Sequence, residues 1–201
     1  MPQPAFDFCD SAARLAAALR AFLAPLPRRL VTAQFRRAGT KPEAPQGEAG
    51  PPLAVVGIGN ALRGDDAFGP AVVAALEPCP ALRLFDVQAV PESFLVPIVS
   101  SGCAGVLFVD AADLGASPGR IALVPAEHLA EVDISTHAIS LALVAEAIQG
   151  LARGESGRHV PCALLGAQPA DLTTADRLSP AMTAAVRLAA AALRTFSYSG
   201  L

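Results

Sequence analysis

Cysteine and the larger aromatic residues are scarce in this sequence. Its 201 residues include four cysteines, one tyrosine and no tryptophan. The cysteines are far apart and form no Cys-x-x-Cys pair, standing at Cys9, Cys79, Cys103 and Cys162. This spacing excludes a dense disulfide framework and is typical of buried free thiols in a reducing compartment. We therefore expect a cytoplasmic protein.

Basic clusters and long apolar runs are also missing. The chain has 15 basic and 18 acidic residues, with a net charge of −3, and no basic run exceeds Pro27-Arg28-Arg29. Nucleic-acid binding surfaces are strongly basic, so a nucleic-acid partner is not expected. No segment has the roughly 18 uninterrupted apolar residues of a membrane span, and Asp7 and Asp10 stand where a secretion signal would carry basic residues. We expect neither membrane insertion nor secretion.

The first fifty residues differ in character from the rest. Asp10-Ser11 can cap a helix that places Leu15 and Leu19 on one face, and Pro25 and Pro27 would end it. Residues 38–52 are rich in Gly, Pro, Glu and Lys without an apolar pattern, which is typical of a linker. The sequence thus predicts an N-terminal extension over 1–50 and one domain over 51–201. The extension would dock either on that domain or on an accessory factor.

Within the domain, short apolar runs alternate with helical patterns. Strands are predicted at 53–58, 82–86, 105–110, 120–125 and 159–165, and helices at 70–76, 91–99, 137–151 and 180–196. This alternation is typical of a sheet between two layers of helices. The fourth strand follows the third through Ser117-Pro118-Gly119 with no room for a crossover helix, so we expect it to pair antiparallel, at an edge.

A glycine-rich loop follows the first predicted strand. It runs from Gly57 to Pro70 and contains two adjacent acids, Asp65 and Asp66. Glycines after a strand can cradle a phosphate, which suggests nucleotide binding as an alternative. The spacing is not Gly-x-Gly-x-x-Gly, however, and the two carboxylates would repel a phosphate. We therefore favour another role for this loop.

Three side chains form a candidate metal-contacting set. Asp66 lies in the loop, Asp110 ends the third predicted strand, and His137 opens a predicted helix. The carboxyl ends of strands in open α/β sheets line the ligand crevice, so both acids are expected on one rim. Two carboxylates and an imidazole suit Zn, Ni or Mn and leave coordination positions open. Taken singly, each acid could instead cap a turn or a helix, and the histidine could be an ordinary surface or core residue.

The usual hydrolase signatures are absent. The sequence has no His-Glu-x-x-His, no Gly-x-Ser-x-Gly and no cysteine in a recognisable catalytic setting. A conventional zinc protease or a serine hydrolase is therefore not indicated.

Four ordered motifs carry a resemblance to a known family. They are Gly57-Ile58-Gly59-Asn60 with Asp65-Asp66, Val109-Asp110-Ala111, Ser135-Thr136-His137, and Gly166-Ala167-Gln168-Pro169 followed by Leu178-Ser179-Pro180. In this order the chain resembles the hydrogenase maturation endopeptidases, over roughly residues 53–193. The resemblance implies three α/β/α layers around a five-stranded mixed sheet, of the phosphorylase/hydrolase-like type, with an N-terminal helical extension added.

The resemblance also implies a function. The enzyme, an aspartyl-type peptidase, would remove the C-terminal extension of a NiFe hydrogenase large-subunit precursor after nickel insertion. Asp66, Asp110 and His137 would contact the nickel carried by the precursor, and no organic cofactor is expected. The implied catalytic residues are Asp66 and Asp86, the implied substrate-binding residues are Gly59, Asn60 and Gln168, and the enzyme would act as a monomer. How the bond is cleaved stays open between a carboxylate that activates water and nickel acting as a Lewis acid.

One departure from the family lies after the second predicted strand. Members of the family often have an acid followed by a glycine-containing turn, whereas Asp86 is followed by Val87 and Gln88. Without glycine the backbone conformations open to this loop differ, which would alter the fit of the substrate tail. Ala67, where glycine is common, is a milder change.

A non-catalytic α/β module that binds a peptide tail or a nucleotide is the alternative function.

Overall fold

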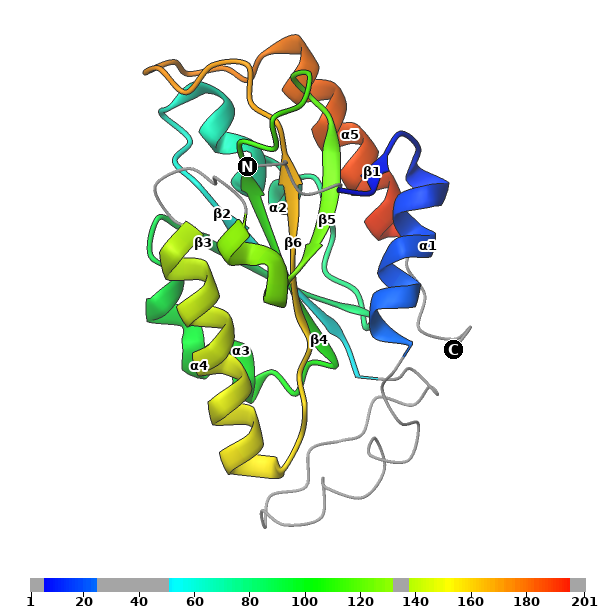
Figure 1. Ribbon diagram of the computed structural model, residues 1–201, viewed down its shortest axis with the longest axis vertical. Coiled ribbons are helices and arrows are strands. Elements are labelled where there is room, and N and C mark those ends of the chain that lie inside the picture. The colour runs from blue at the N-terminus through cyan, green and yellow to red at the C-terminus, as the bar shows by residue number, and fades with distance from the viewer. Residues whose placement is uncertain (1–5, 25–50, 132–137, 196–201) are drawn as a thin grey trace.

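The computed structural model describes residues 6–24, 51–131 and 138–195 and confirms the α/β class (Figure 1). The strands of this part of the chain are β1 (Phe8–Cys9), β2 (Leu53–Ile58), β3 (Leu82–Gln88), β4 (Gly105–Ala111), β5 (Ile121–Pro125) and β6 (Cys162–Ala167). Its α-helices are α1 (Ala12–Leu23), α2 (Phe68–Ala74), α3 (Leu95–Ser100), α4 (Ala138–Ser156) and α5 (Pro180–Arg194). Short 3-10 helices are η2 (Gly64–Ala67), η3 (Pro91–Phe94) and η4 (Ala126–Glu131).

One mixed sheet runs through the molecule in the order β1-β5-β6-β4-β2-β3. Strands β3, β2, β4 and β6 are parallel, whereas β5 is antiparallel to β6, as the short β4–β5 connection predicts. The described sheet has six strands rather than five, because β1 adds two antiparallel residues along β5. The expectation that β5 lies at an edge was therefore wrong, since β1 is the edge strand on that side. Two residues are too few to show an alternating pattern, so this strand could not be predicted from the sequence.

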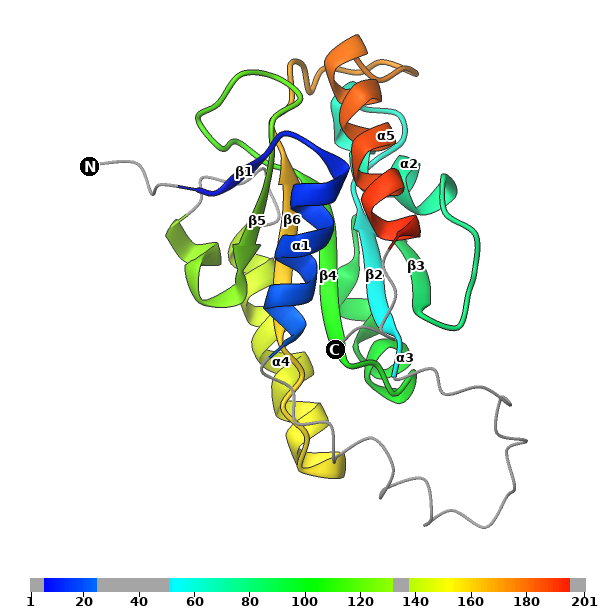
Figure 2. The same ribbon diagram turned by 90° about the vertical axis from the view of Figure 1, so that its right-hand side faces the viewer.

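Helices cover both faces of the sheet, which gives the expected three layers (Figure 2). One core contains buried side chains of α1, α2 and α5, and the other contains those of α3 and α4. Consecutive β2 residues alternate between the two, so that Val55 faces the first core and Val56 the second. A strand buried on both faces reads as a continuous apolar run, and this explains why the central strands were readily predicted.

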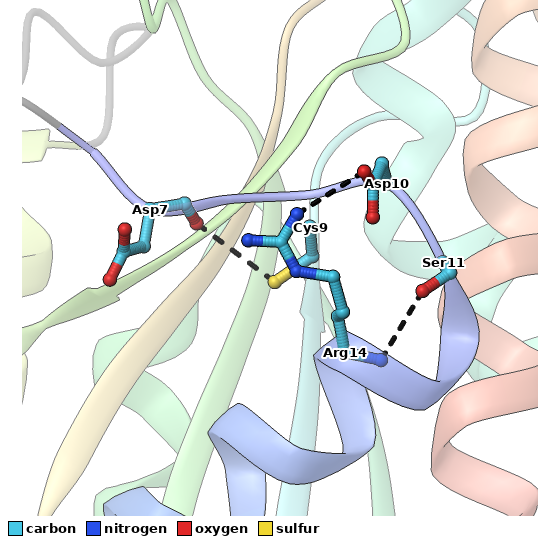
Figure 3. Close-up of polar contacts among 5 residues, drawn as sticks. All are labelled: Asp7, Cys9, Asp10, Ser11 and Arg14. Atoms are coloured by element: carbon cyan, nitrogen blue, oxygen red, sulfur yellow. Dashed lines mark hydrogen bonds and ion pairs between the residues drawn. The ribbon is translucent and has the colours of Figure 1, made fainter.

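The described part of the N-terminal extension packs on this domain. Ser11 caps α1, with its Oγ accepting a hydrogen bond from the Arg14 N–H at 3.4 Å, and Arg14 Nη1 lies 3.2 Å from Asp10 Oδ2 (Figure 3). Leu15 and Leu19 are fully buried, in the core that α1 shares with α5. Residues 6–24 therefore pack on the domain itself, which was one of the two expected docking sites; the other was an accessory factor. The predicted linker lies mostly outside the described residues, and the boundary at residue 50 stays a prediction.

Removing one buried α1 side chain tests whether this helix belongs to the folding unit. Because Leu19 is fully buried, Leu19→Ala is expected to lower the free energy of unfolding by about 2–5 kcal/mol. The matched control is Leu143→Ala on α4, whose side chain is 60% exposed. Denaturant unfolding measures both variants. A Leu19→Ala loss no larger than that of the control would show that α1 docks without stabilising the domain.

Two further expectations can be checked. All four cysteines are free thiols, but only three are buried, and Cys79 is exposed in the turn before β3, so the expectation that all are buried was wrong for this residue. Within the residues that the structure covers, no helix has both the length and the apolar character needed to cross a membrane.

Candidate active site

Asp66 lies in η2, between the end of β2 and the start of α2. Its side chain is only 4% exposed, and its Oδ2 accepts a hydrogen bond from the Asn60 N–H at 3.0 Å. Gly59 has a φ of +132°, and a Cβ atom there would lie 1.8 Å from the Asp66 carbonyl oxygen. Only glycine fits this close crossing of two backbone segments. Gly59 and Asn60 thus hold Asp66 in place from the end of β2.

The start of α2 brings this loop against β4. A Cβ atom at Gly69 would lie 2.2 Å from the carbonyl oxygens of both Ile58 and Val109. The helix can approach the two strand ends so closely only because residue 69 has no side chain. The residue after Val109 is Asp110, so this contact brings the two acids to the same end of the sheet.

Asp110 is a fully buried carboxylate at the end of β4. Neither of its oxygens has a hydrogen-bond partner among the described residues. Burial, and then the negative charge of Asp66, raise the pKa of Asp110 well above its usual range; the nearby Ala111 N–H lowers this pKa by less, although it does not have the geometry of a hydrogen bond to either oxygen. Buried polar groups nearly always have partners, so one without any suggests a ligand or ion that is bound during function. A cation would relieve both the burial and the repulsion.

The third member of the predicted set, His137, lies outside the described residues. Helix α4 begins at the next residue, Ala138. Within the described ranges, no three His, Cys, Asp or Glu side chains lie close enough together to hold a metal ion. The structure therefore brings together Asp66 and Asp110, and the complete set stays a prediction.

A cleft of about 250 Å³ opens beside the end of β3. Its lining residues come from the first glycine-rich loop, the start of α2 and the end of β3: Gly59, Asn60, Ala61, Leu62, Pro70, Asp86, Gln88 and Ala89. The exposed Asp86 accepts a hydrogen bond from the Gln88 N–H at its Oδ1, at 3.3 Å. Three predicted site residues, Gly59, Asn60 and Asp86, therefore share one cleft, whereas Asp66 is buried and does not line it.

Gln168 lies after β6 and does not line this cleft. Its Oε1 accepts hydrogen bonds from the N–H groups of Leu114, at 2.7 Å, and Ala116, at 3.1 Å. Its backbone also bonds to Gly119 and Arg120. These contacts tie the β4–β5 loop to β6, and the substrate-binding role of Gln168 stays a prediction.

Asp65 has a role that sequence reasoning did not assign. Its carboxylate is 1% exposed and accepts four hydrogen bonds. The donors are the backbone N–H groups of Ala170, Asp171 and Ser179, at 2.8, 3.3 and 2.7 Å, and the Ser179 hydroxyl, at 2.9 Å. Asp65 thereby joins η2 to the β6–α5 loop and fixes the backbone next to Asp66. The sequence signal was a second acid beside the first, but its partners lie more than 100 residues away.

The fold and these carboxylates define a class. The chain is a three-layer α/β protein with paired acids at the carboxyl ends of parallel strands, where such sheets bind their ligands. The sequence model of the HycI family, described as hydrogenase maturation protease, matches residues 72–195. The match covers more than half of the chain, which therefore belongs to the hydrogenase maturation protease family. It begins after the glycine-rich loop that carries Asp65 and Asp66.

Known proteins of this family are similar to the chain. Hydrogenase 3 maturation protease of Escherichia coli K12 is 31% identical over 81 residues, which are 39% of this chain and 52% of that protein. The chain thus spans about half the length of the curated relatives it matches. The crystal structure of the NiFe hydrogenase maturation protease HycI from Thermococcus kodakarensis has a TM-score of 0.59 at 30% identity, over 72% of this chain and 93% of that one. E. coli HybD, a hydrogenase maturating endopeptidase, has a TM-score of 0.60 at 25% identity, over 74% and 94%.

Proposed function

We propose that this chain is a peptidase that removes the C-terminal extension of a NiFe hydrogenase large-subunit precursor once nickel has been inserted. The nickel belongs to the precursor. Asp66, Asp110 and His137 of the peptidase contact this nickel before the precursor is cleaved. The enzyme works as an aspartyl-type peptidase without an organic cofactor. It acts as a monomer. Its place is the cytoplasm, a reducing compartment in which the four free thiols would stay reduced.

The observation that carries this proposal is the buried Asp110 carboxylate beside Asp66. Two acids that repel one another, one of them without a partner among the described residues, form an unfavourable pair until a cation arrives. A metal ion held by the precursor's own ligands supplies the positive charge. Because oxygen ligands hold nickel weakly, the pair can recognise the ion without removing it from the precursor. Recognition of the precursor then depends on its metal.

The peptide tail fits the neighbouring cleft. Asp86 is exposed on its wall, and the cleft adjoins the loop that holds Asp66. Two routes to bond cleavage agree with these positions. Either Asp66 or Asp86 activates the attacking water as a general base, or nickel polarises the scissile carbonyl while the carboxylates orient the substrate.

Processing of the precursor tests this function. The nickel-loaded large-subunit precursor is incubated with the enzyme, and mass spectrometry follows the loss of its tail. Wild type is expected to cut the nickel-loaded precursor and to leave the nickel-free one intact. Asp66→Ala and His137→Ala are expected to lower the rate by about 100-fold or more, since loss even of outer-shell partners at metal sites typically costs 10–100-fold.

Asp176→Ala is the matched control, because this side chain is 84% exposed and forms an ion pair with the adjacent Arg177, at 3.6 Å. Unchanged cleavage by Asp66→Ala, or cleavage that ignores nickel, would overturn the proposal. A stable complex with no processed product would show instead that the chain is a non-catalytic module that binds the tail. Asp86→Asn tests Asp86 as the general base, since a base at this position requires its carboxylate for cleavage but not for binding.

A further inference from the structure

Gln88, at the end of β3, has an unusual backbone conformation. Its φ is +51°, and it is the one non-glycine residue in the described ranges with a positive φ. The strand is irregular here, because Gly57 pairs with Asp86 but Ile58 pairs with Gln88, which leaves Val87 as an extra residue. The left-handed region is unfavourable for a residue with a Cβ atom and is relieved by glycine. The chain therefore accepts strain at this position.

The surroundings of Gln88 hold this conformation in place. The side chain of Val87 is 1% exposed and anchored in the core. The Gln88 N–H donates to Asp86 Oδ1 at 3.3 Å, and the Gln88 carbonyl accepts from the Gly59 N–H at 2.9 Å. All of these contacts use the backbone of Gln88 or its neighbours. A glycine at position 88 would make the same hydrogen bonds without the strain.

The side chain of Gln88 contributes nothing to the core, because it is exposed. It lies on the wall of the 250 Å³ cleft, together with Asn60 and Asp86. Strain retained for an exposed side chain beside a cleft points to a role in binding rather than in folding. The cleft is also lined by Leu62, whose side chain is 69% exposed and offers an apolar contact.

We propose that the Gln88 side-chain amide binds the main chain of an extended peptide in this cleft and helps to determine which tail the enzyme accepts. The amide has both a donor and an acceptor, which match the C=O and N–H of one extended residue. Leu62 receives an apolar side chain of the same peptide. This inference rests on the proposed function, since it takes the precursor's tail as the peptide.

Three substitutions separate the strain from the binding. Gln88→Ala keeps the strain and removes the amide, Gln88→Gly removes both, and Gln88→Asn keeps an amide in a residue that tolerates positive φ. Gln88→Gly is expected to raise Tm by about 2–4 °C and Gln88→Ala to leave it unchanged. Both are expected to weaken binding of a synthetic peptide with the tail sequence by about 10-fold, the effect of two lost hydrogen bonds to the peptide main chain. In processing, both are expected to raise KM more than they lower kcat.

Fluorescence anisotropy measures peptide binding without requiring cleavage. Peptide affinity within twofold of wild type for both Gln88→Ala and Gln88→Gly would overturn the inference, even if the enzyme cuts its precursor normally. Another result is that wild type binds the peptide in a way that depends on Gln88 and yet does not cleave the precursor. That result would reject the proposed function and retain this inference. A wild type that binds no tail peptide overturns the inference as well. Recovery of affinity in Gln88→Asn, beyond that of Gln88→Ala, is the supporting result.

Discussion

Replacing Asp110 with asparagine is expected to make the metal-free protein more stable and to abolish processing. The wild-type carboxylate is fully buried, lacks a hydrogen-bond partner among the described residues and is repelled by Asp66. Asparagine has nearly the same shape and carries no charge. We expect Asp110→Asn to raise the free energy of unfolding at pH 7 by about 1–3 kcal/mol, because the neutral amide lacks the negative charge that burial and Asp66 make unfavourable in the folded state. A residue that destabilises the fold and is needed for activity is retained for function.

The increase in stability expected for Asp110→Asn should depend on pH in a defined direction. Burial and Asp66 raise the pKa of Asp110 in the folded state above the value of about 3.9 for an aspartate in an unfolded chain. Below about pH 4 the group is protonated in both states, and the carboxylate adds no charge penalty. As the pH rises towards the folded pKa, the folded state binds more protons than the unfolded state, so wild type loses stability. The gap between variant and wild type should open from about pH 4 upwards and become constant above the folded pKa.

Denaturant unfolding at a series of pH values, with a chelator present, measures this gap. Asp113→Asn is the matched control, because Asp113 lies just after β4, three residues from Asp110. Unlike Asp110 it is exposed, and it accepts a hydrogen bond from the Gly115 N–H at 3.0 Å. No gap that opens with pH is expected for the control. A destabilised Asp110→Asn would show that the carboxylate is favourably paired in the folded protein, and would remove the argument for a cation between the two acids.

Removing the Asp65 carboxylate is expected to destabilise the protein by about 3 kcal/mol. The Asp65 carboxylate is buried, and Asp65→Ala would remove the charged acceptor that its four donors share. Ser179 is affected twice, because its Oγ also caps α5 by accepting from the Met182 N–H at 3.1 Å. Processing should fall as well, since η2 loses its connection to the β6–α5 loop and Asp66 is no longer held in place. Denaturant unfolding and the precursor assay measure the two effects.

The control for this prediction is Asp176→Ala, in the same β6–α5 loop. Its side chain is exposed and pairs with the adjacent, equally exposed Arg177, so neither stability nor processing should change. An Asp65→Ala loss below about 1 kcal/mol would contradict the role assigned to this residue, because partners to a buried charged acceptor typically contribute more than that.

Much of the fold follows from local pattern. The central strands are continuous apolar runs bounded by turns. Helix α5 has Ser179 as its N-cap and Pro180 as its first residue, as the sequence predicts. The predicted antiparallel pairing of the fourth strand is confirmed, because a short turn leaves no other geometry. The two-residue β1 was missed, and the exposure of Cys79 was misjudged. Both depend on what packs nearby rather than on the residues themselves.

The candidate site divides in the same way. Asp66 and Asp110 were expected on one rim because the carboxyl ends of parallel strands share one edge of a sheet, and in the structure the charge of Asp66 contributes to the raised pKa of Asp110. The function of Asp65 could not be identified, since its hydrogen-bond donors are 105 to 114 residues away. The strain at Gln88 was equally hidden, because a backbone angle is a property of the folded loop.

By itself, the sequence determined the α/β class, the order of the main strands and helices, and two acids at one end of the sheet. These features depend on apolar periodicity, turn residues and chain connectivity, all of which are local. Only the tertiary structure decided that Asp110 is buried without a partner in the described chain, that Asp65 joins two distant loops, and that Gln88 lines a cleft in a strained conformation. Burial, long-range hydrogen bonds and backbone strain arise only when segments far apart in the chain pack together.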